Sequence, residues 1–447
     1  MSWNIFKQKA APPLQEVGLA GVKISNGYVF DEFLPQLQGE KGRKVFREMR
    51  DNDDTVSSIV FAIEMVLRAV EWRVDENEVY RGTAESLAQK EFLKSVLFDD
   101  MSHTWDDFIS EVLTMLTYGW EYTEIVYKRR MGPDHPDSRF RSNYSDGKIG
   151  LRKLANRAQE TLDRWEVDDT GGINGMWQSP PLGGASRYIP IEKALLFRPH
   201  PMKGSPEGRS VLRGAYRSWY FLKRLQDIEA IAIERELNGL PVVYIPNEIL
   251  QGLSADAVKA RTAYEKLVRD IKFNEQGGVV LPSNPYYDAE GKPTSVKQVE
   301  LKLLSSEGSR SIDPSVAITR YQQGIARTVL ADFIMLGVND RGSFALSSSK
   351  TELFVRATEG WLGAITNTVN RFLLPKLWAY NNFPTKYCPL LAHGPVSPTD
   401  LGILGNYLAD LSRAGAPLFP DEDLENDLRD RAHLPRKSDT ADIPENV

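Results

Sequence analysis

The sequence predicts a mixed α+β fold, because long stretches with helical spacing alternate with short segments of strand-like composition. The clearest helical stretch, 206–238, starts at Pro206 and stops before Gly239 and Pro241, which are typical helix start and stop residues. The stretch 313–336 places its apolar residues three or four positions apart, which is the spacing of an amphipathic helix. At 447 residues, the chain is expected to form about three domain-sized units.

The composition argues against several classes of protein. The formal net charge is −6 and the pI is near 5.6, so the chain lacks the basic surface of a tight nucleic-acid binder. Its single cysteine, Cys388, allows no intrachain disulfide. No run of about 18 apolar residues predicts a membrane span, and the N-terminus lacks the apolar core of a signal peptide. We therefore expect a protein that folds in a cytoplasm, does not bind membranes and lets DNA slide past it.

The first 205 residues are interpreted as an N-terminal arm, 1–50, followed by an α/β domain, 51–205. The arm is irregular and contains Pro12-Pro13. The acidic run from Asp51 to Asp54 fits either a helix N-cap or a calcium loop, and the cap is favoured because a helical apolar stripe follows it. Further expected elements are helices at 83–98 and 104–117, a cap formed by Thr104 and Asp107, strands at 122–127 and 187–197, and a polar loop at 130–148.

The stretch 206–238 is the most informative part of the sequence. As one helix it would be about 50 Å long, at about 1.5 Å per residue. Its apolar residues mostly step by three, so they drift around the helix and do not form a single stripe, and charged residues lie between them. This pattern fits a helix that contacts two neighbouring molecules. It also fits a long helix buried inside one large domain, and the pattern alone leaves both possibilities open.

A compact module is expected between the two helical stretches, at 240–308. It should contain strands at 241–245 and 298–303 and a helix capped by Ser254, which together predict a small α/β unit. The helix at 313–336 follows, and we expect it to end at Gly337.

A polar loop is expected at 338–348. Ser349 and Glu352 form a capping box, which predicts that a third helix runs from 350 to about 380. Residues expected to bend or break this helix are Gly360, Gly363 and, most strongly, Pro375. Short helices are expected near the C-terminus, at 399–414 and 421–432.

No motif in the sequence predicts catalysis or the binding of a cofactor or metal. The five histidines are scattered, and none lies at metal-ligand spacing from another histidine or from Cys388, which we interpret as a buried or incidental thiol. There is no phosphate-binding loop, and Gly171 to Gly175 is interpreted as a turn. A metal-dependent nuclease could use Glu229, Glu234 or Glu236, but alternating charges on a long helix usually form a solvated or interfacial face.

Two stretches of local sequence and the order of elements carry a resemblance to a known family. The first stretch reads Pro206-Glu207-Gly208-Arg209-Ser210-Val211-Leu212-Arg213, Ala215-Tyr216-Arg217, Trp219-Tyr220-Phe221, Ile228-Glu229-Ala230, Glu234-Arg235 and Gly239-Leu240-Pro241-Val242. The second reads Ala331-Asp332-Phe333-Ile334-Met335-Leu336-Gly337, Gly342-Ser343-Phe344-Ala345-Leu346-Ser347 and Lys350-Thr351-Glu352. With the order of elements, they resemble the portal proteins of tailed bacteriophages, in particular their Mu-like branch. The matches cover about 206–354, and the flanks agree only in the order of elements.

This resemblance implies a portal-type α+β architecture. Its parts would be an N-terminal arm (1–50), an α/β wing (51–205), a first stem helix (206–238), a small α/β clip (239–312), a second stem helix (313–337), a tunnel loop (338–349), a tunnel helix that returns to the wing (350–398), and a short helical crown with the C-terminal tail (399–447).

The resemblance further implies a non-enzymatic protein without a cofactor, which forms a homo-oligomeric ring, usually of twelve copies, at one capsid vertex of the virion. DNA would be packaged and ejected through this ring, which would be assembled in the host cytoplasm. The implied partners are double-stranded DNA, contacted without sequence specificity, the terminase large subunit, the head–tail adaptor, and the major capsid and scaffold proteins. The alternatives are a metal-dependent DNA-processing enzyme and a different virion adaptor or scaffold protein.

Two sets of site residues follow from a ring, in which each long helix has two lateral neighbours. The DNA-channel loop would contain Asn339, Asp340, Arg341, Gly342, Ser343, Phe344 and Ser347. The subunit interface of the stem would contain Tyr216, Trp219, Leu222, Leu225, Ile228, Arg235, Tyr321 and Ile325.

Overall fold

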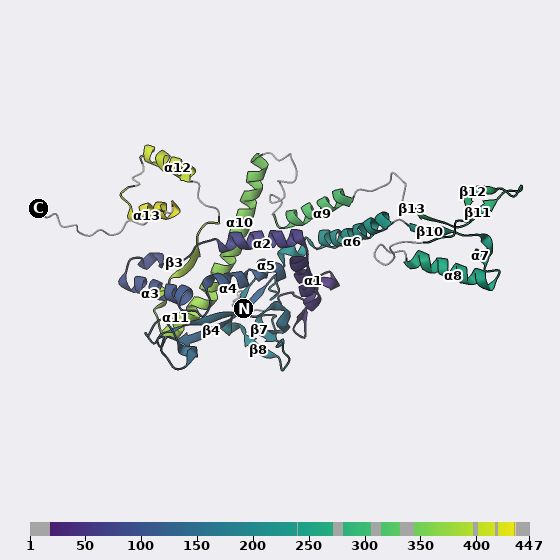
Figure 1. The fold of residues 1–447 in the computed structure, drawn as a ribbon. Coiled ribbons are helices and arrows are strands. Elements are labelled where there is room, and N and C mark those ends of the chain that lie inside the picture. The colour runs from purple at the N-terminus through teal and green to yellow at the C-terminus, as the bar shows by residue number, and fades with distance from the viewer. Residues whose placement is uncertain are drawn as a thin grey trace, which may run out of the picture. The chain divides into compact units, whose positions relative to one another are not determined.

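A computed structural model of the chain describes residues 18–238, 240–270, 280–304, 314–330, 344–396, 401–415, 419–432 and 434. The chain divides into two compact units (Figure 1). The larger unit combines Met1–Ala215 with Ile325–Val447, and the smaller unit is Tyr216–Gly324. The smaller unit is therefore an insertion in the larger one. No helix within the described residues is long and apolar enough to cross a membrane.

The larger unit contains most of the elements that precede and follow the insertion. Its helices are α1 (Gly39–Asn52), α2 (Asp54–Arg68), α3 (Ala84–Lys94), α4 (Trp105–Val112), α5 (Thr114–Tyr118), α10 (Phe344–Thr368), α11 (Leu374–Asn381), α12 (Leu401–Arg413) and α13 (Glu422–Arg431). Its strands are β1 (Ile24–Ser25), β2 (Tyr28–Val29), β3 (Trp72–Asp75), β4 (Glu121–Arg129), β5 (Ile149–Asn156), β6 (Leu162–Val167), β7 (Ile173–Gln178), β8 (Arg187–Pro190), β9 (Ala194–Phe197) and β14 (Leu390–His393).

Two three-stranded antiparallel sheets, β5-β4-β9 and β6-β7-β8, organise the larger unit. An aromatic core joins them, because Trp120 and Tyr122 at the start of β4 pack against Trp165 of β6 with ring centroids 5.0 and 5.8 Å apart. Strand β14 pairs with β3, so the chain returns to the larger unit after the insertion. These sheets form the rigid frame to which the helices attach.

Several helix boundaries were predicted correctly from their caps. Asp53 caps α2 by accepting a hydrogen bond from the Val56 N–H at 2.8 Å, so the acidic run is a helix cap, as favoured. Thr104 and Asp107 form a complete capping box at α4. These signals are local, and the structure agrees with them residue by residue.

The last twelve residues of the predicted N-terminal arm, 39–50, belong to a helix. Residues 39–52 form α1, which packs against α2 and α5 and buries Phe46 and Met49. The arm was assigned because the segment looked irregular in the sequence. Its apolar and long polar side chains nevertheless recur at four-residue spacing, and this weak pattern is enough for a helix when tertiary contacts stabilise it. The α/β domain therefore begins at least twelve residues before Asp51.

The smaller unit begins with α6 (Tyr216–Asn238) and contains most of α9 (Pro314–Thr328). Between them lies a small α/β module, as predicted, with the antiparallel pair β10 (Leu240–Tyr244) and β13 (Glu300–Leu304). Its other described elements are α7 (Asn247–Gln251), α8 (Ala255–Asp270) and a hairpin of β11 (Pro285–Tyr287) and β12 (Pro293–Lys297). α8 is the helix expected after Ser254, whereas the hairpin was not predicted.

The three long helices are shorter or differently bounded than expected. α6 begins ten residues after Pro206, and α9 ends at Thr328, followed by Leu330 in the left-handed region with φ 58°. α10 continues through Gly360 and Gly363, so the helix does not break at either glycine. The break at Pro375 is confirmed, because a π-helical turn at Val369–Leu373 precedes α11, which carries this proline in its first turn.

Candidate functional site

The helix pair formed by α6 and α9 in the smaller unit is held together by close contacts. At Gly324 on α9, a Cβ atom would lie 2.8 Å from the Ser218 hydroxyl oxygen on α6, so the absence of a side chain lets the helices approach. One turn further along, the rings of Phe221 and Tyr321 stack with their planes 21° apart and their centroids 6.1 Å apart. The two helices thus form one packed element.

The outer face of α6 exposes large apolar side chains at helical spacing. Tyr220, Phe221, Ile228 and Ile231 are 37, 40, 61 and 49 % exposed, and Ile228 and Ile231 follow the aromatic pair by two and three turns. The guanidinium of Arg224 lies over the Tyr220 ring, 5.0 Å from its centroid. This face is apolar enough to bind another protein surface, and we call it the α6 stripe.

Half of the predicted interface residues do not belong to an exposed face. Tyr216, Trp219, Leu222 and Ile325 are buried in the single chain, with Trp219 only 6 % exposed. A side chain buried in one copy offers no surface to the next copy, so these four are corrected to core residues. Of the others, Leu225 and Tyr321 are half-buried, Ile228 is exposed, and the side chain of Arg235 lies outside the described residues. Steps of three in the sequence did not distinguish the inward from the outward side.

The predicted DNA-channel loop lies mostly outside the described residues, which exclude Asn339 to Ser343. Phe344 and Ser347 were assigned to this loop, but their backbone forms the first turns of α10. The loop is therefore shorter than predicted at its C-terminal end. Ser349 lies inside α10 and does not start a helix, because helical backbone already precedes it.

The segment 199–214, which we call the strap, explains why Pro206 does not start a helix. Its backbone is engaged elsewhere, because the Arg209 N–H donates to the His200 carbonyl at 3.0 Å. The Ser210 hydroxyl donates to the Thr117 carbonyl at the end of α5, at 2.6 Å. A Cβ atom at Gly208 would lie 2.5 Å from the carbonyl oxygen of Gly119, the residue that follows α5, so the strap packs directly against the end of this helix. Only a short 3₁₀ turn at Val211–Arg213 forms before α6.

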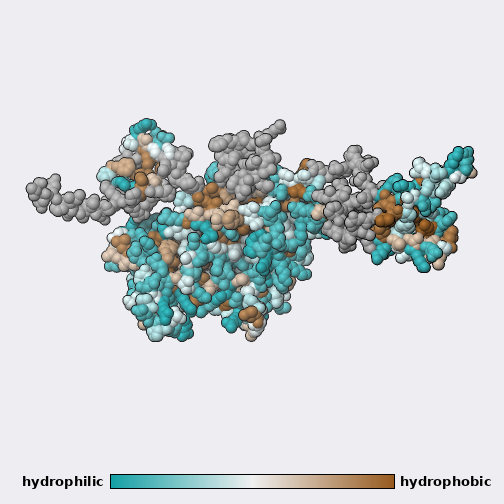
Figure 2. Space-filling model, in the orientation of Figure 1, coloured by the Kyte–Doolittle hydropathy of each residue, from teal (hydrophilic) through white to brown (hydrophobic). Residues whose placement is uncertain are grey.

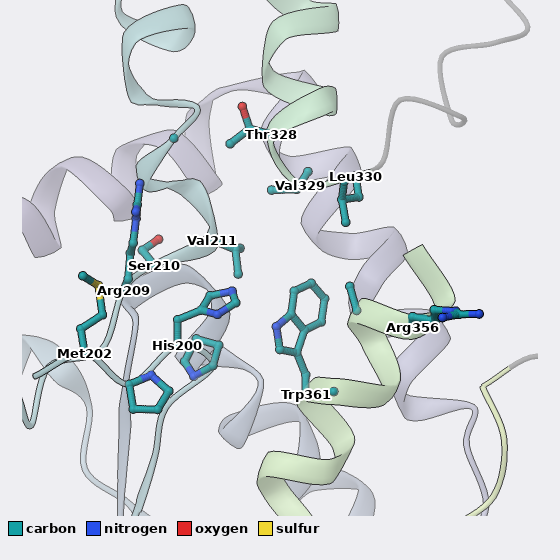
Figure 3. Close-up of a pocket in the computed structure, with 15 residues that line it drawn as sticks. His200, Met202, Arg209, Ser210, Val211, Thr328, Val329, Leu330, Arg356 and Trp361 are labelled. Atoms are coloured by element: carbon teal, nitrogen blue, oxygen red, sulfur yellow. The ribbon is translucent and has the colours of Figure 1, made fainter. Parts of the chain in front are cut away.

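A cavity of about 710 Å³ opens between the strap, the last turn of α9 and the middle of α10 (Figure 3). The indole of Trp361 on α10 projects into it opposite His200, and Val329 lies above the indole in this view. None of its lining residues is acidic. The lining residues are Pro199, His200, Pro201, Met202, Arg209, Ser210, Val211, Gly214, Thr328, Val329, Leu330, Arg356, Ala357, Gly360 and Trp361. The cavity is thus apolar with basic groups at its edge, and the sequence analysis did not find it.

Two carboxyl groups, the half-buried Glu207 of the strap and the buried Glu121 of β4, have raised pKa values. Burial raises the pKa of Glu207, whose carboxylate accepts a hydrogen bond from the Trp165 indole N–H at 3.0 Å. Burial raises the pKa of Glu121 well above its usual value, and one of its carboxyl oxygens has no hydrogen-bond partner among the described residues. Neither group faces the cavity lining, so we assign both to the structure and not to chemistry.

A search for clustered metal ligands covers the described residues only. No group of three or more histidine, cysteine, aspartate or glutamate side chains in this part of the chain could hold a metal ion. Burial raises the pKa of the Cys388 thiol to about 11, so the thiol is protonated at neutral pH and is a poor nucleophile. The side chains of Glu234 and Glu236 lie outside the described residues.

Comparison with solved structures shows a similar fold in chains of two particle structures. A chain in the virion of a native gene transfer agent particle has a TM-score of 0.50 and 12 % sequence identity, covering 88 % of this chain and 93 % of its own. A chain in the neck of the native gene transfer agent particle, computed with C12 symmetry, has a TM-score of 0.50 and 14 % identity, covering 88 % of this chain and 94 % of its own.

The sequence itself identifies the family. The family model described as the portal protein of Mu bacteriophage matches residues 43–430, which include the whole smaller unit, most of the larger unit, the strap and the cavity. The match extends well beyond the stretch 206–354 that carried the resemblance. The chain therefore belongs to the Mu bacteriophage family of portal proteins.

Proposed function

We propose that this portal protein assembles into a ring of twelve copies at one vertex of a capsid, and that double-stranded DNA enters and leaves through the ring. The family match over residues 43–430 carries the proposal. The subunit number is supported by the similar chain in a particle neck that was computed with C12 symmetry. The net charge of −6 suits a channel through which DNA moves, because few counterions are released when DNA passes an acidic surface.

The parts of the chain are assigned to the parts of a portal. The larger unit up to the strap is the wing, α6 and α9 are the stem, and the module between them is the clip, which docks the terminase large subunit and later the head–tail adaptor. The loop before α10 is the tunnel loop, with Arg341 as its DNA-facing cation, and α12 and α13 form the crown. We place the wing against the major capsid and scaffold proteins, and we assign the protein no catalytic site and no cofactor.

The α6 stripe is our revised candidate for the stem interface. Ile228 remains from the predicted set, and Tyr220, Phe221 and Ile231 join it because they are exposed on the same helix. Each copy in a closed ring has two neighbours, so an exposed apolar face is buried when the ring forms. The half-buried residues Leu225 and Tyr321 lie at the margin of this contact.

Light scattering and negative-stain electron microscopy test the proposed ring. The purified chain should form closed rings with a mass about twelve times 50.4 kDa. Ile228→Asp should weaken assembly by about tenfold or more, because an unpaired carboxylate would be buried between copies. Gln226→Asp is the matched control, because Gln226 is exposed on the opposite side of α6. A chain that stays monomeric at every concentration would contradict the proposal, and so would equal effects of the two variants.

A further inference from the structure

Two separate surfaces of the larger unit have complementary chemistry. The first is the cavity between the strap, α9 and α10, which we call the socket. Trp361, Val329 and Met202 give it an apolar interior, and the exposed Arg209 lies at its edge (Figure 3). Arg356 also belongs to the lining, but its guanidinium pairs with Glu352 at 2.7 Å. The lining contains no acidic residue, and Arg209 places a positive charge at the edge, so the socket favours an apolar occupant with a negative charge beside it.

The second surface is the outer side of α2, which we call the knob. Asp54, Ser58, Phe61 and Met65 follow one another at steps of four, three and four, so they lie along one side of the helix. Phe61 is 60 % exposed and Met65 is 39 % exposed, whereas the opposite side of α2 buries five apolar side chains in the core. Figure 2 shows a hydrophobic area over α2. The knob is therefore apolar and has an acidic end.

From these surfaces we infer that the knob of one copy fills the socket of the next copy in the ring. The inference rests on the proposed ring and names a contact in the wing that the ring uses in addition to the stem. The socket has a volume within the range of pockets that enclose drug-sized ligands, so it holds the Phe61 and Met65 side chains together. Asp54 then approaches Arg209 at the edge of the socket.

The contact is heterologous, because the knob and the socket are different patches of one chain. Contacts of this kind close into a ring when the rotation between copies allows it, and each copy then uses both patches. The methionines at both surfaces, Met65 and Met202, suit such a contact because their flexible side chains fill irregular gaps. Burial in a neighbouring copy also accounts for Phe61, which is otherwise an aromatic side chain left in solvent.

Cysteine cross-linking tests the contact directly. In a Cys388→Ala background, Ser58→Cys is combined with Leu330→Cys at the edge of the socket, and a short bismaleimide is added to assembled rings. A heterologous contact gives a ladder of covalent oligomers on a denaturing gel, reaching the size of the closed ring. The matched control combines Ser58→Cys with Tyr188→Cys, which is exposed on β8 of the same unit, and should give no ladder.

Assembly of the cross-linking variants separates the two proposals. If rings form and the Ser58–Leu330 pair gives only cross-linked monomers, dimers or no product, the knob-and-socket contact is wrong and the ring stands. If neither the unmodified chain nor the variants form rings, the proposed function fails first.

Phe61→Asp adds a second readout and should raise the concentration for half-assembly about tenfold or more while leaving the melting temperature within about 2 °C. An unchanged assembly curve for Phe61→Asp would overturn the inference.

Discussion

The two compact units differ in how much aromatic surface one core encloses, although the larger unit also exposes aromatic side chains such as Phe61. The larger unit encloses Trp120, Tyr122 and Trp165 in one core, where each ring is at most 2 % exposed. The smaller unit leaves Phe221 at its surface, and Tyr244 and Tyr287 are 50 and 64 % exposed. Burial of large aromatic surface is a main source of stability, so the larger unit can support its own fold. The smaller unit leaves apolar side chains exposed to solvent, and they become buried only when another molecule covers them.

The sharpest test of this difference is Trp165→Ala in the larger unit. The change removes ring contacts with Trp120 and Tyr122 and leaves the half-buried carboxylate of Glu207 without its indole donor. We expect a loss of about 3–5 kcal/mol in the free energy of unfolding, measured by denaturant titration with circular dichroism. Trp177→Ala is the control, because this half-buried ring lies on the other side of the same sheet. Equal losses would show that the aromatic core is not what holds the unit.

The next largest effect is expected where the strap meets α9. A Cβ atom at Gly214 would lie 2.4 Å from the Cγ2 methyl of Thr328, which is closer than side chains approach one another. Gly214→Ala should therefore cost about 1–3 kcal/mol, as overpacking does, although alanine is the better helix former. Thr328→Ser removes the clashing methyl, so the double variant should recover most of the melting temperature. Without such a recovery, the close approach is not the cause of the loss.

These contacts also show what the sequence could predict. Caps at Asp53 and Thr104 act through atoms three residues away, so local residues are sufficient to predict them. Pro206 gives an equally strong start signal, yet the strap donates hydrogen bonds to the Thr117 carbonyl of α5 and, within the strap, to the His200 carbonyl. A distant partner overrode the local preference here, and no property of the residues around Pro206 encodes where that partner lies.

The candidate site follows the same division. The exposed Ile228 was predicted, but Trp219 and Leu222 lie on the inner side of the same helix and are core residues. Apolar residues that step by three occupy every side of a helix, so only the packed structure separates core from surface. The socket was missed for a related reason, because its walls come from 199–214, the end of α9 and the middle of α10. Segments so far apart in the chain leave no common pattern in the sequence.

A smaller effect is expected from the buried carboxyl of Glu121 in the larger unit. Burial raises its pKa in the fold, so the folded state keeps a proton that the unfolded chain releases near pH 4.5. The fold therefore loses stability as the pH rises above the unfolded pKa. Glu121→Gln keeps the shape of the side chain and removes this penalty. It should raise the free energy of unfolding by about 1–2 kcal/mol at pH 7, seen as a higher melting temperature, but should not raise it at pH 4. An identical gain at both pH values would assign the effect to packing and not to protonation.

The smallest effect should come from the smaller unit, at the stacked rings of Phe221 and Tyr321. A double-mutant cycle with Phe221→Ala and Tyr321→Ala should give a coupling of about 0.5–1.5 kcal/mol in the isolated chain, because aromatic pairs contribute this much beyond their buried area. Phe221 also belongs to the α6 stripe, so Phe221→Ala should weaken ring assembly more than Tyr321→Ala does. If both variants change stability and assembly in the same proportion, the exposed side of Phe221 has no role between copies. The contrast between a larger unit with a closed aromatic core and a smaller unit that depends on assembly then fails at this residue.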